Sequence, residues 1–214
     1  MIEEVGAKFS LKKLESAQSL AKKIVQEVSL QVFEGMSEDD GIQLVDKAYE
    51  KYNITKKWHP TKFRIGINTV CAFREKSSPV QLKKGDYYFI DIGPVIDGHE
   101  GDFGETFRFQ SKDDLLLVDS KKIFDLVKNK FYEQKLSGEQ LYEYAESCAQ
   151  EMNYTLVSAQ KGHRIGDFPH ALYFKKGLRD YNDIPVPNRW VLEVHIIHSS
   201  NKYGAFYEDI ISNQ

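Results

Sequence analysis

Two aspartates, Asp91 and Asp102, stand in a stretch whose other residues are typical of a β-hairpin. Residues Tyr87–Ile92 are mostly aromatic or β-branched, which favours a strand, and Asp97–Gly98 is a strong signal for a two-residue turn. With that turn, Asp91 pairs with Gly104, and Asp102 lies diagonally from Asp91 on the same face, about 7–8 Å away between Cα atoms. The hairpin therefore predicts two carboxylates directed at one place.

Two carboxylates held this close repel each other, so one pKa rises unless a cation lies between them. The hairpin itself offers no such cation, because no Lys or Arg occurs between Gly85 and Phe107. A bound metal ion would supply the missing charge. The alternative is a solvated sheet face, on which each acid is hydrated separately.

A second pair of acids follows the same pattern near the end of the sequence. Trp190–Ile197 and Gly204–Ile211 have strand composition and are joined through Ser199–Lys202. If this four-residue connection is symmetric, Glu193 faces Glu208 directly. Each hairpin then contributes two acids to one face, and this coincidence favours a shared site over two solvated surfaces.

His163 is the candidate imidazole ligand, because Gly162 and Gly166 beside it allow tight turns and close backbone approach. A structural histidine is the alternative interpretation. Four carboxylates with one imidazole form an oxygen-rich donor set, which suits two divalent first-row ions (Mn, Co, Fe or Zn) better than a structural zinc. Two such ions can activate a water and polarise a carbonyl, which is hydrolytic chemistry.

Helices with apolar residues at helical spacing are expected before each hairpin. Their expected bounds are Leu11–Phe33, Ser37 to about Tyr52, Asp113–Lys135, and Ser137 to about Met152. Ser37 and Ser137 both resemble N-cap residues, and the pattern after Ser37 recurs one hundred residues later after Ser137. Arg64–Phe73 is interpreted as one or two strands with a turn near Gly66–Asn68. The repeat predicts two halves related by an approximate two-fold axis, with the site between them; chance similarity of two units is the alternative.

Composition narrows the class of protein. The 214 residues are 41% hydrophobic and carry a formal net charge of −3, which gives no reason to expect nucleic acid or an anionic membrane as a partner. The sequence has no long apolar run and no signal-peptide pattern, and its two cysteines lack metal-type spacing. We therefore expect a cytoplasmic protein in which residues 1–214 form a single catalytic domain, with a homodimer as one option.

The motifs together resemble the pita-bread metallopeptidases, a family that includes methionine aminopeptidase, Xaa-Pro aminopeptidase, prolidase and creatinase. The resemblance extends from about Ser10 to the end of the chain, and its motif order and the spacing from Asp91 to Asp102 match the family pattern. The motifs are Asp91-Ile92-Gly93, Asp102 with Thr106-Phe107, Gly162-His163-x-Ile165-Gly166 with His170, Leu192-Glu193, and Phe206-x-Glu208-Asp209. The resemblance implies an α+β pita-bread fold, in which two pseudo-two-fold halves of helices pack on a curved antiparallel sheet.

The resemblance also implies a role for each matching residue. Asp91 would chelate a first metal ion, and Asp102 and Glu208 would bridge both ions. His163 and Glu193 would bind the second ion, with Glu193 as the general base that activates a water. Two divalent ions are therefore the expected cofactor.

His170 would contact the scissile group and stabilise the tetrahedral intermediate. It is followed by Ala171–Leu172, which is closer to the Xaa-Pro enzymes than to the methionine aminopeptidases. The sequence departs from the family at Phe73, where a substrate-facing histidine is usual, and at Val194, where proline is frequent. His59 is the candidate to replace the missing histidine, so His59 and Phe73 are the expected substrate-binding residues.

The function expected from the sequence is a dinuclear-metal aminopeptidase of Xaa-Pro type that removes the N-terminal residue of short peptides. Two alternatives stay open. One is a hydrolase or lyase of a non-peptide small molecule on the same fold, which Phe73 favours. The other is a non-catalytic metal-binding module, which would have no need to keep all five ligands and His170.

Overall fold

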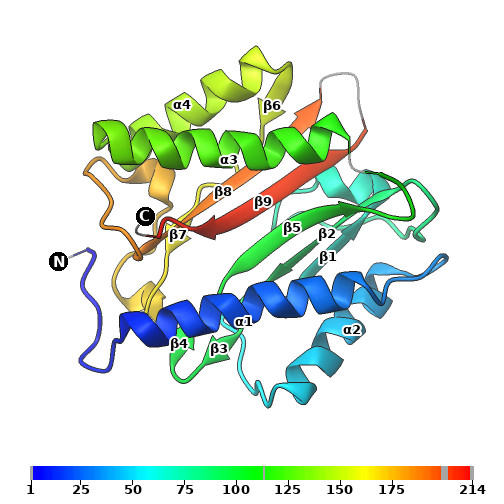
Figure 1. Ribbon diagram of the computed structural model, residues 1–214, viewed down its shortest axis with the longest axis horizontal. Helices are drawn as coiled ribbons and strands as arrows, with labels where there is room; N and C mark the ends of the chain where they lie inside the picture. The colour runs from blue at the N-terminus through cyan, green and yellow to red at the C-terminus, as the bar shows by residue number, and fades with distance from the viewer. Residues whose placement is uncertain (1, 113, 199–201, 213–214) are drawn as a thin grey trace.

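The computed structural model describes residues 2–112, 114–198 and 202–212. Within these residues the centre is a seven-stranded antiparallel sheet with the order β1-β2-β5-β9-β8-β6, in which β7 also pairs with β8 (Figure 1). Its strands are β1 (Lys62–Ile65), β2 (Tyr87–Ile92), β5 (Phe103–Arg108), β6 (Tyr154–Leu156), β7 (His163–Arg164), β8 (Trp190–His198) and β9 (Gly204–Ile210). A separate two-stranded sheet is formed by β3 (Val95–Ile96) and β4 (His99–Glu100).

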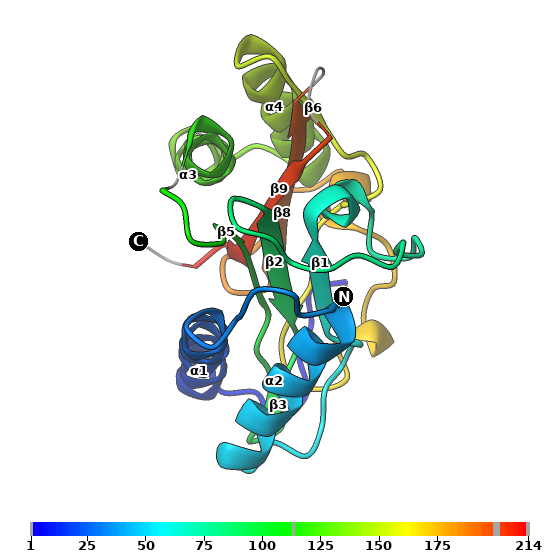
Figure 2. The same cartoon turned by 90° about the vertical axis from the view of Figure 1, so that its right-hand side faces the viewer.

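Two pairs of α-helices pack on the sheet. Helices α1 (Leu11–Ser29) and α2 (Glu38–Lys51) contact strands of the first half, and α3 (Leu115–Gln134) and α4 (Gly138–Glu151) contact strands of the second half. In Figure 2, α1 and α3 lie on the same side of the strands. Three short 3-10 helices complete the described elements: η1 (Gly66–Val70), η2 (His170–Leu172) and η3 (Leu178–Asp180).

The order of the strands repeats the internal symmetry expected from the sequence. The first half contributes β1, β2 and β5 from one edge to the centre, and the second half contributes β6, β8 and β9 from the other edge. Each half begins with two helices, and the second helix of each carries a capping box, at Ser37 and at Ser137. The two halves join where β5 pairs with β9.

The helix bounds agree with the expected ones except at the end of the first helix. Helix α1 ends at Ser29 and not at Phe33, because the next residues leave the core: Leu30 is 87% exposed and Phe33 is 52% exposed. Without packing on an apolar face, a further helical turn has little to stabilise it. Helix α3 begins after the N-cap Asp114 and ends at Gln134, followed by Lys135 in the left-handed conformation. The expected start of α3 at Asp113 lies outside the described residues.

The register predicted for the first hairpin is confirmed. Asp91 pairs with Gly104, and Ile96 pairs with His99 across the Asp97–Gly98 turn. The hairpin is not continuous, however, because β3 and β4 form a sheet of their own and the chain leaves the ladder at residues 101–102. The expected strand after Glu100 is therefore split into β4 and β5.

The register predicted for the second hairpin is also confirmed, with Glu193 opposite Glu208. The Ser199–Asn201 part of the expected connection lies outside the described residues. Between α2 and the first hairpin, β1 ends at Ile65 and Gly66 adopts a positive φ of 57° at the start of η1. The expected turn is present there, whereas the strand expected as far as Phe73 is replaced beyond Ile65 by this 3-10 helix and by irregular chain.

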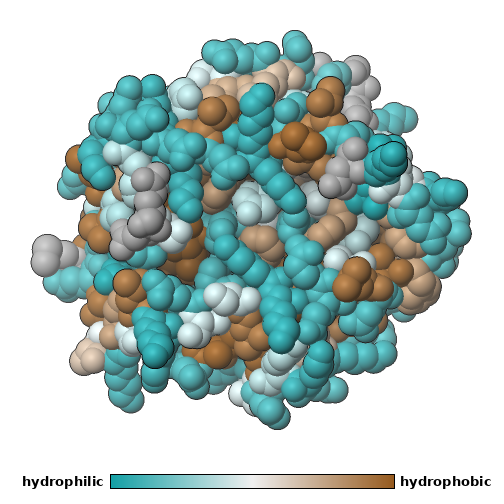
Figure 3. Space-filling model, in the orientation of Figure 1, coloured by the Kyte–Doolittle hydropathy of each residue, from teal (hydrophilic) through white to brown (hydrophobic). Residues whose placement is uncertain are grey.

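Alternation along the strands separates the core from the opposite face of the sheet. Ile90 and Ile92 of β2 belong to the apolar cluster that contains α1 and α2, and Leu192 and Val194 of β8 belong to the cluster that contains α3 and α4. Residues between them, such as Asp91, therefore project to the face away from these helices. The outer surface seen in Figure 3 is largely hydrophilic, with separate hydrophobic patches. No described helix is long and apolar enough to cross a membrane.

Candidate metal centre

Three of the four acids predicted from the two hairpins stand in one row across four adjacent strands. Asp91 on β2 pairs with Gly104 on β5, and Gly104 pairs with Glu208 on β9. Glu208 in turn pairs with Glu193 on β8. Because directly paired residues project to the same face of a sheet, the three acids of this row share one face.

Asp102 lies in the break between β4 and β5, where its side chain is buried between two histidines. Nε2 of His163 is 2.8 Å from Oδ2 of Asp102, and Nε2 of His59 is 3.3 Å from Oδ1. The same His59 nitrogen is 3.5 Å from Oδ1 of Asp91. Donor atoms thus gather in two groups that share Asp102, each within 4.8 Å: His59, Asp91 and Asp102, and Asp102, His163 and Glu208.

Gly104 leaves the space that these donors need. A Cβ atom at this position would lie 2.4 Å from Cε1 of Phe206 and 2.6 Å from Oε1 of Glu208, far closer than non-bonded atoms approach. Any side chain at position 104 of β5 would therefore displace the Glu208 carboxylate. The sequence pattern marks Gly104 only as the partner of Asp91, and this second reason for a glycine becomes visible with the β5–β9 pairing.

Burial and mutual repulsion make the carboxylates of the row hard to ionise. Burial is the main cause that raises the pKa of Asp91 to about 6, partly offset by the nearby His59. Burial also raises the pKa of Glu208 well above its ordinary value, and the charges of Asp102 and Asp91 add to the effect. A divalent cation would remove this penalty by stabilising the ionised forms.

The pKa of Asp102 shifts in the opposite direction, because two histidines lie beside its carboxylate. Burial acts to raise its pKa, but His163 and His59 together hold the pKa of Asp102 below its ordinary value. Burial disfavours the charged imidazole, yet Asp102 raises the pKa of His163 to about 9. Asp91 and Asp102 likewise outweigh burial and raise the pKa of His59. The positive charges of the two imidazoles therefore balance the negative charge of the buried Asp102.

The donors fit a centre for divalent ions. Oε1 of Glu208 is buried and forms no hydrogen bond with any described residue, which is costly unless another ligand engages it. The two donor groups share one carboxylate, so two ions could be bound side by side. Carboxylate oxygens with imidazole nitrogen suit divalent first-row metals, as expected from the sequence.

Glu193 lines the same pocket but joins neither compact group. Its Oε2 accepts hydrogen bonds from the backbone N–H groups of Lys161 and Gly162, at 2.8 and 2.6 Å. Burial raises the pKa of Glu193, while the His163 charge opposes the rise. A carboxylate with a raised pKa, held at the edge of the donor cluster, is placed to exchange a proton.

His170 is oriented by an acid that the sequence analysis did not single out. Glu100 is fully buried; its Oε1 accepts a hydrogen bond from the backbone N–H of His170 at 2.9 Å, and its Oε2 lies 2.7 Å from Nδ1 of the His170 ring. This pairing directs the other ring nitrogen, Nε2, away from Glu100. The sequence did contain one indication of this role: Glu100 stands two residues before Asp102 on the returning strand, a spacing that places both side chains on one face.

Gln18 on α1 fixes the backbone at the break in the first hairpin. Its side chain accepts a hydrogen bond from the Asp102 N–H at 2.8 Å and donates to the Asp102 carbonyl at 2.6 Å. It also donates to Oδ1 of Asp209 at 2.8 Å. The Asp102 carboxylate is therefore positioned by a helix 84 residues earlier in the chain, which no local pattern could indicate.

All eight site residues predicted from the sequence line one pocket of about 540 Å³. They are Asp91, Asp102, His163, Glu193, Glu208, His170, His59 and Phe73. Trp58, which was not among the predicted site residues, stands among them: its ring centre is 4.2 Å from that of His59, 4.8 Å from that of His163 and 4.7 Å from that of His170. Trp58 therefore forms a wall of the pocket next to three imidazoles.

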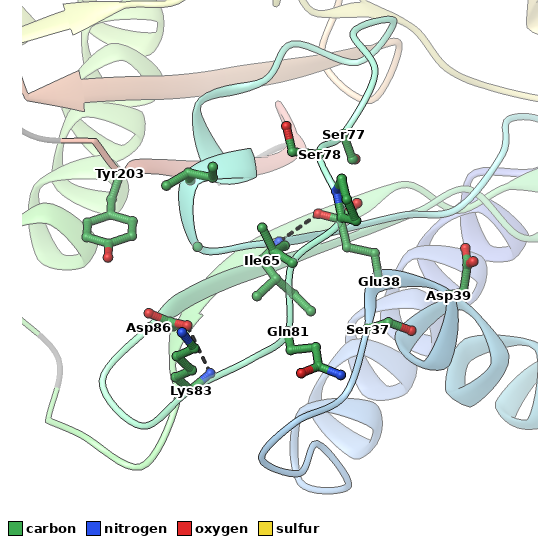
Figure 4. A pocket seen from close by; sticks show the side chains of 14 residues that line it. Ser37, Glu38, Asp39, Ile65, Ser77, Ser78, Gln81, Lys83, Asp86 and Tyr203 are labelled. Carbon is green, nitrogen blue, oxygen red and sulfur yellow. Dashed lines mark hydrogen bonds between the residues drawn. The ribbon is translucent and has the colours of Figure 1, made fainter.

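The loop that carries Phe73 is anchored on its other side by α2. Oε1 of Glu38 accepts hydrogen bonds from the Ile65 N–H and the Asn68 side chain, each at 2.9 Å. Figure 4 shows Glu38 pointing at Ile65 in a second hollow, of about 990 Å³, that the same loop covers. There Asp86 accepts a hydrogen bond from the backbone N–H of Lys83, so the carboxylates of Glu38 and Asp86 both have partners within the fold and serve to hold the loop in place.

Comparison with known proteins identifies the family. The model of metallopeptidase family M24 matches residues 12–212, and the chain therefore belongs to this family. A methionine aminopeptidase from Buchnera aphidicola is 26% identical over 191 residues, which cover 80% of this chain and 69% of that protein.

Solved structures show the same fold, the α+β pita-bread fold expected from the sequence. An X-Pro aminopeptidase from Thermotoga maritima superimposes with a TM-score of 0.74 at 16% identity, covering 95% of this chain and 61% of that one. A prolidase from Pyrococcus horikoshii gives 0.73 at 18% identity, covering 94% and 58%. A methionine aminopeptidase from Thermotoga maritima gives 0.73 at 14% identity, covering 95% and 96%. The chain thus spans about three fifths of the length of the first two structures and nearly all of the third.

Proposed function

We propose that residues 1–214 form one catalytic domain of a dinuclear-metal aminopeptidase of Xaa-Pro type, which removes the N-terminal residue of short peptides. The observation that carries the proposal is the pair of donor groups sharing Asp102 in a pocket that also contains Glu193 and His170. Membership of a metallopeptidase family supports a hydrolytic role for this pocket. The metal ligands are proposed to be Asp91, Asp102, His163, Glu193 and Glu208.

Two divalent ions bound here would supply Lewis-acid activation of a water and of the scissile carbonyl. Glu193 would take the proton of the attacking water and pass it to the leaving amine, a role that fits its raised pKa. His170, fixed by Glu100, would donate a hydrogen bond to the oxyanion of the tetrahedral intermediate. Trp58 and Phe73 would exclude bulk water from the wall of the pocket.

The size and charge of the pocket support a small substrate. Its volume of about 540 Å³ lies within the range of small-molecule sites. Arg74, Lys175 and Lys176 line the same pocket as the acidic donors. Cations in this position would attract the free carboxylate of a dipeptide or tripeptide, while the acidic floor would attract its amino group.

A non-peptide substrate is the second candidate, and one observation favours it. Phe73 lines the pocket at the position where the family resemblance implies a substrate-facing histidine, and an aromatic ring there cannot hydrogen-bond a peptide group. A small amide or ester lacking a second peptide bond would not need that contact.

The test combines metal analysis with a substrate panel. Protein purified without chelator is analysed for divalent ions, then assayed with Mn²⁺ or Co²⁺ on Xaa-Pro dipeptides and on peptides that begin with Met. Two ions per chain with Xaa-Pro cleavage is the expected result. Cleavage of Met-initiated peptides alone would overturn the Xaa-Pro assignment, two ions without peptide cleavage would favour a non-peptide substrate, and no ion uptake would overturn the enzyme proposal.

A cytoplasmic location is part of the proposal. Cys71 and Cys148 are both free, which suits a reducing compartment.

A further inference from the structure

We propose that His59 is a protein ligand of the ion that Asp91 would hold, so that each of the two ions is bound by one histidine. The inference rests on the dinuclear centre of the proposed function and goes beyond it, because the family resemblance implies imidazole ligation for the second ion alone. It also replaces the substrate-contacting role that the sequence analysis gave to His59.

The first argument is the distance between donor atoms. Nε2 of His59 lies 3.3 Å from Oδ1 of Asp102 and 3.5 Å from Oδ1 of Asp91. Donors that each lie about 2.1 Å from one tetrahedral ion are about 3.4 Å apart. The distances from the His59 nitrogen to the two carboxylates therefore match the distance between two ligands of one ion. They are longer than an ordinary hydrogen bond.

The second argument is the way in which the ring is held. Nδ1 of His59 is 2.9 Å from the carbonyl oxygen of Pro60, an acceptor only, so Nδ1 carries a hydrogen and Nε2 is the nitrogen that would present a lone pair to an ion that displaces its proton. His163 repeats the arrangement: its Nδ1 is 2.7 Å from the carbonyl oxygen of Arg164 while Nε2 faces Asp102. Metal-binding histidines characteristically donate their other N–H to such a carbonyl, which fixes the tautomer and the ring orientation.

The third argument is that the chain makes room for His59 and locks it in place. A Cβ atom on Gly93 would lie 2.2 Å from Cδ2 and 2.4 Å from Nε2 of the His59 ring. The neighbouring Trp58 is anchored by hydrogen bonds from its backbone N–H to the Gly93 carbonyl, at 2.9 Å, and from Nε1 to the Gly101 carbonyl, at 3.1 Å. These contacts hold the buried imidazole before any ion arrives, as a preorganised ligand requires.

The two histidines approach Asp102 from opposite edges of the sheet. His59 precedes β1 at one edge and faces Oδ1, whereas His163 lies in β7 at the other edge and faces Oδ2. Asp102 is thus placed to bridge two ions that have matched donor sets of imidazole and carboxylate. A site with oxygen ligands alone suits Mn. An imidazole ligand on each ion shifts the metal preference of the centre toward Co, Fe or Zn.

The main test compares His59→Ala with His170→Ala. His170 is a suitable control because its ring also packs against Trp58, yet its Nδ1 faces Glu100 and not the shared Asp102. Metal-free wild type and both variants are titrated with Co²⁺ by calorimetry, with bound ions counted by elemental analysis. We expect one of the two ions to bind His59→Ala at least about 100-fold more weakly, and both to bind His170→Ala with wild-type affinity.

Wild-type affinity for both ions in His59→Ala would overturn the inference while leaving the proposed function intact. Failure of the wild type to bind Co²⁺ would instead overturn the proposed function. A second measurement needs no variant: in the Co²⁺-loaded wild type, the ring N–H of each ligating histidine gives a strongly shifted, exchangeable proton signal in NMR. Two such signals are expected, and a single one would overturn the ligand role of His59.

Discussion

The two hairpins that build the site position their acids by different means. In the second hairpin, β8 and β9 pair without interruption, and Glu193 and Glu208 face one another by alternation alone. In the first hairpin the ladder breaks before Asp102, and that residue is held by side chains from elsewhere in the fold. Regular strands therefore suffice to place two acids side by side, whereas an acid outside the ladder, such as Asp102, is placed by tertiary contacts.

The largest effect is expected from changing Asp102, whose carboxylate belongs to both donor groups. Asp102→Asn removes one anionic oxygen from both donor groups, and should weaken the binding of both ions by more than about 100-fold and abolish turnover. The fold should persist, because the backbone hydrogen bonds to Gln18 do not involve the carboxylate. Metal titration, a peptide assay and circular dichroism check these outcomes, and full activity in this variant would remove the bridging assignment.

A smaller effect on metal binding is expected from a side chain at Gly104, which would fill the space beside Glu208. Gly104→Ala places a methyl group 2.6 Å from Oε1 of Glu208 and should lower the free energy of unfolding by about 1–3 kcal/mol. It should also weaken metal binding by about 10-fold, because the carboxylate must move. Gly166→Ala is the matched control, since a Cβ there meets nothing closer than 3.6 Å. Equal effects of the two substitutions on metal affinity would contradict the role given to Gly104.

The stability of the metal-free protein should fall as the pH rises, because one of the histidines beside Asp102 loses its charge. The pKa of His163 is raised from 6.5 to about 9, so its charged contact with Asp102 stabilises the fold fully below pH 6.5 and is lost as the pH rises toward 9. The change in pKa corresponds to about 3 kcal/mol, so we expect the Tm of the metal-free protein to fall by about 6–12 °C across this range, at about 2–4 °C for each kcal/mol lost.

Metal binding should reverse this trend, because the ions require neutral imidazole and bind more tightly as the pH rises. Thermal melts with and without Mn²⁺ at several pH values measure both effects. His163→Asn should flatten the decline in the metal-free protein. A decline of the same size in that variant would show that other groups are responsible.

The smallest effect is expected at the contact that holds the broken strand. Gln18→Ala removes the bonds to the Asp102 backbone and should cost about 1 kcal/mol of unfolding free energy, with a decrease of a few-fold in metal affinity. Gln26→Ala is a control on the same helix, because the side chain of Gln26 hydrogen-bonds only the side chain of Glu105 among the described residues. Urea denaturation and metal titration of both variants compare them; a loss of metal affinity in Gln26→Ala alone would contradict the proposed clamp.

Much of this arrangement could be predicted from the sequence because it follows from local rules. A two-residue turn in the first hairpin and a symmetric four-residue connection in the second are enough to predict which residues pair, and they place Asp91 opposite Gly104 and Glu193 opposite Glu208. The capping boxes at Ser37 and Ser137 are equally local. Such features depend on residues a few positions apart.

The remaining features depend on contacts between distant parts of the chain. Glu100 meets His170 from 70 residues away, and Gln18 meets Asp102 from 84 residues away, so neither partnership leaves a pattern in one sequence. The approach of His59 to Asp91 and Asp102 is of the same kind. The end of α1 at Ser29 was missed because the apolar spacing continues past the point where the core stops.

The seam between β5 and β9 has a mechanical consequence. Two residue pairs join these strands, Gly104 with Glu208 and Glu105 with Tyr207, and Thr106 adds hydrogen bonds to the backbone of Phe206. The buried acids on either side of this short seam repel one another in the absence of a cation. Ions shared by Asp102 of one half and Glu208 of the other would act as cross-links between segments about a hundred residues apart, so the force needed to pull the two halves apart should depend on the concentration of free metal.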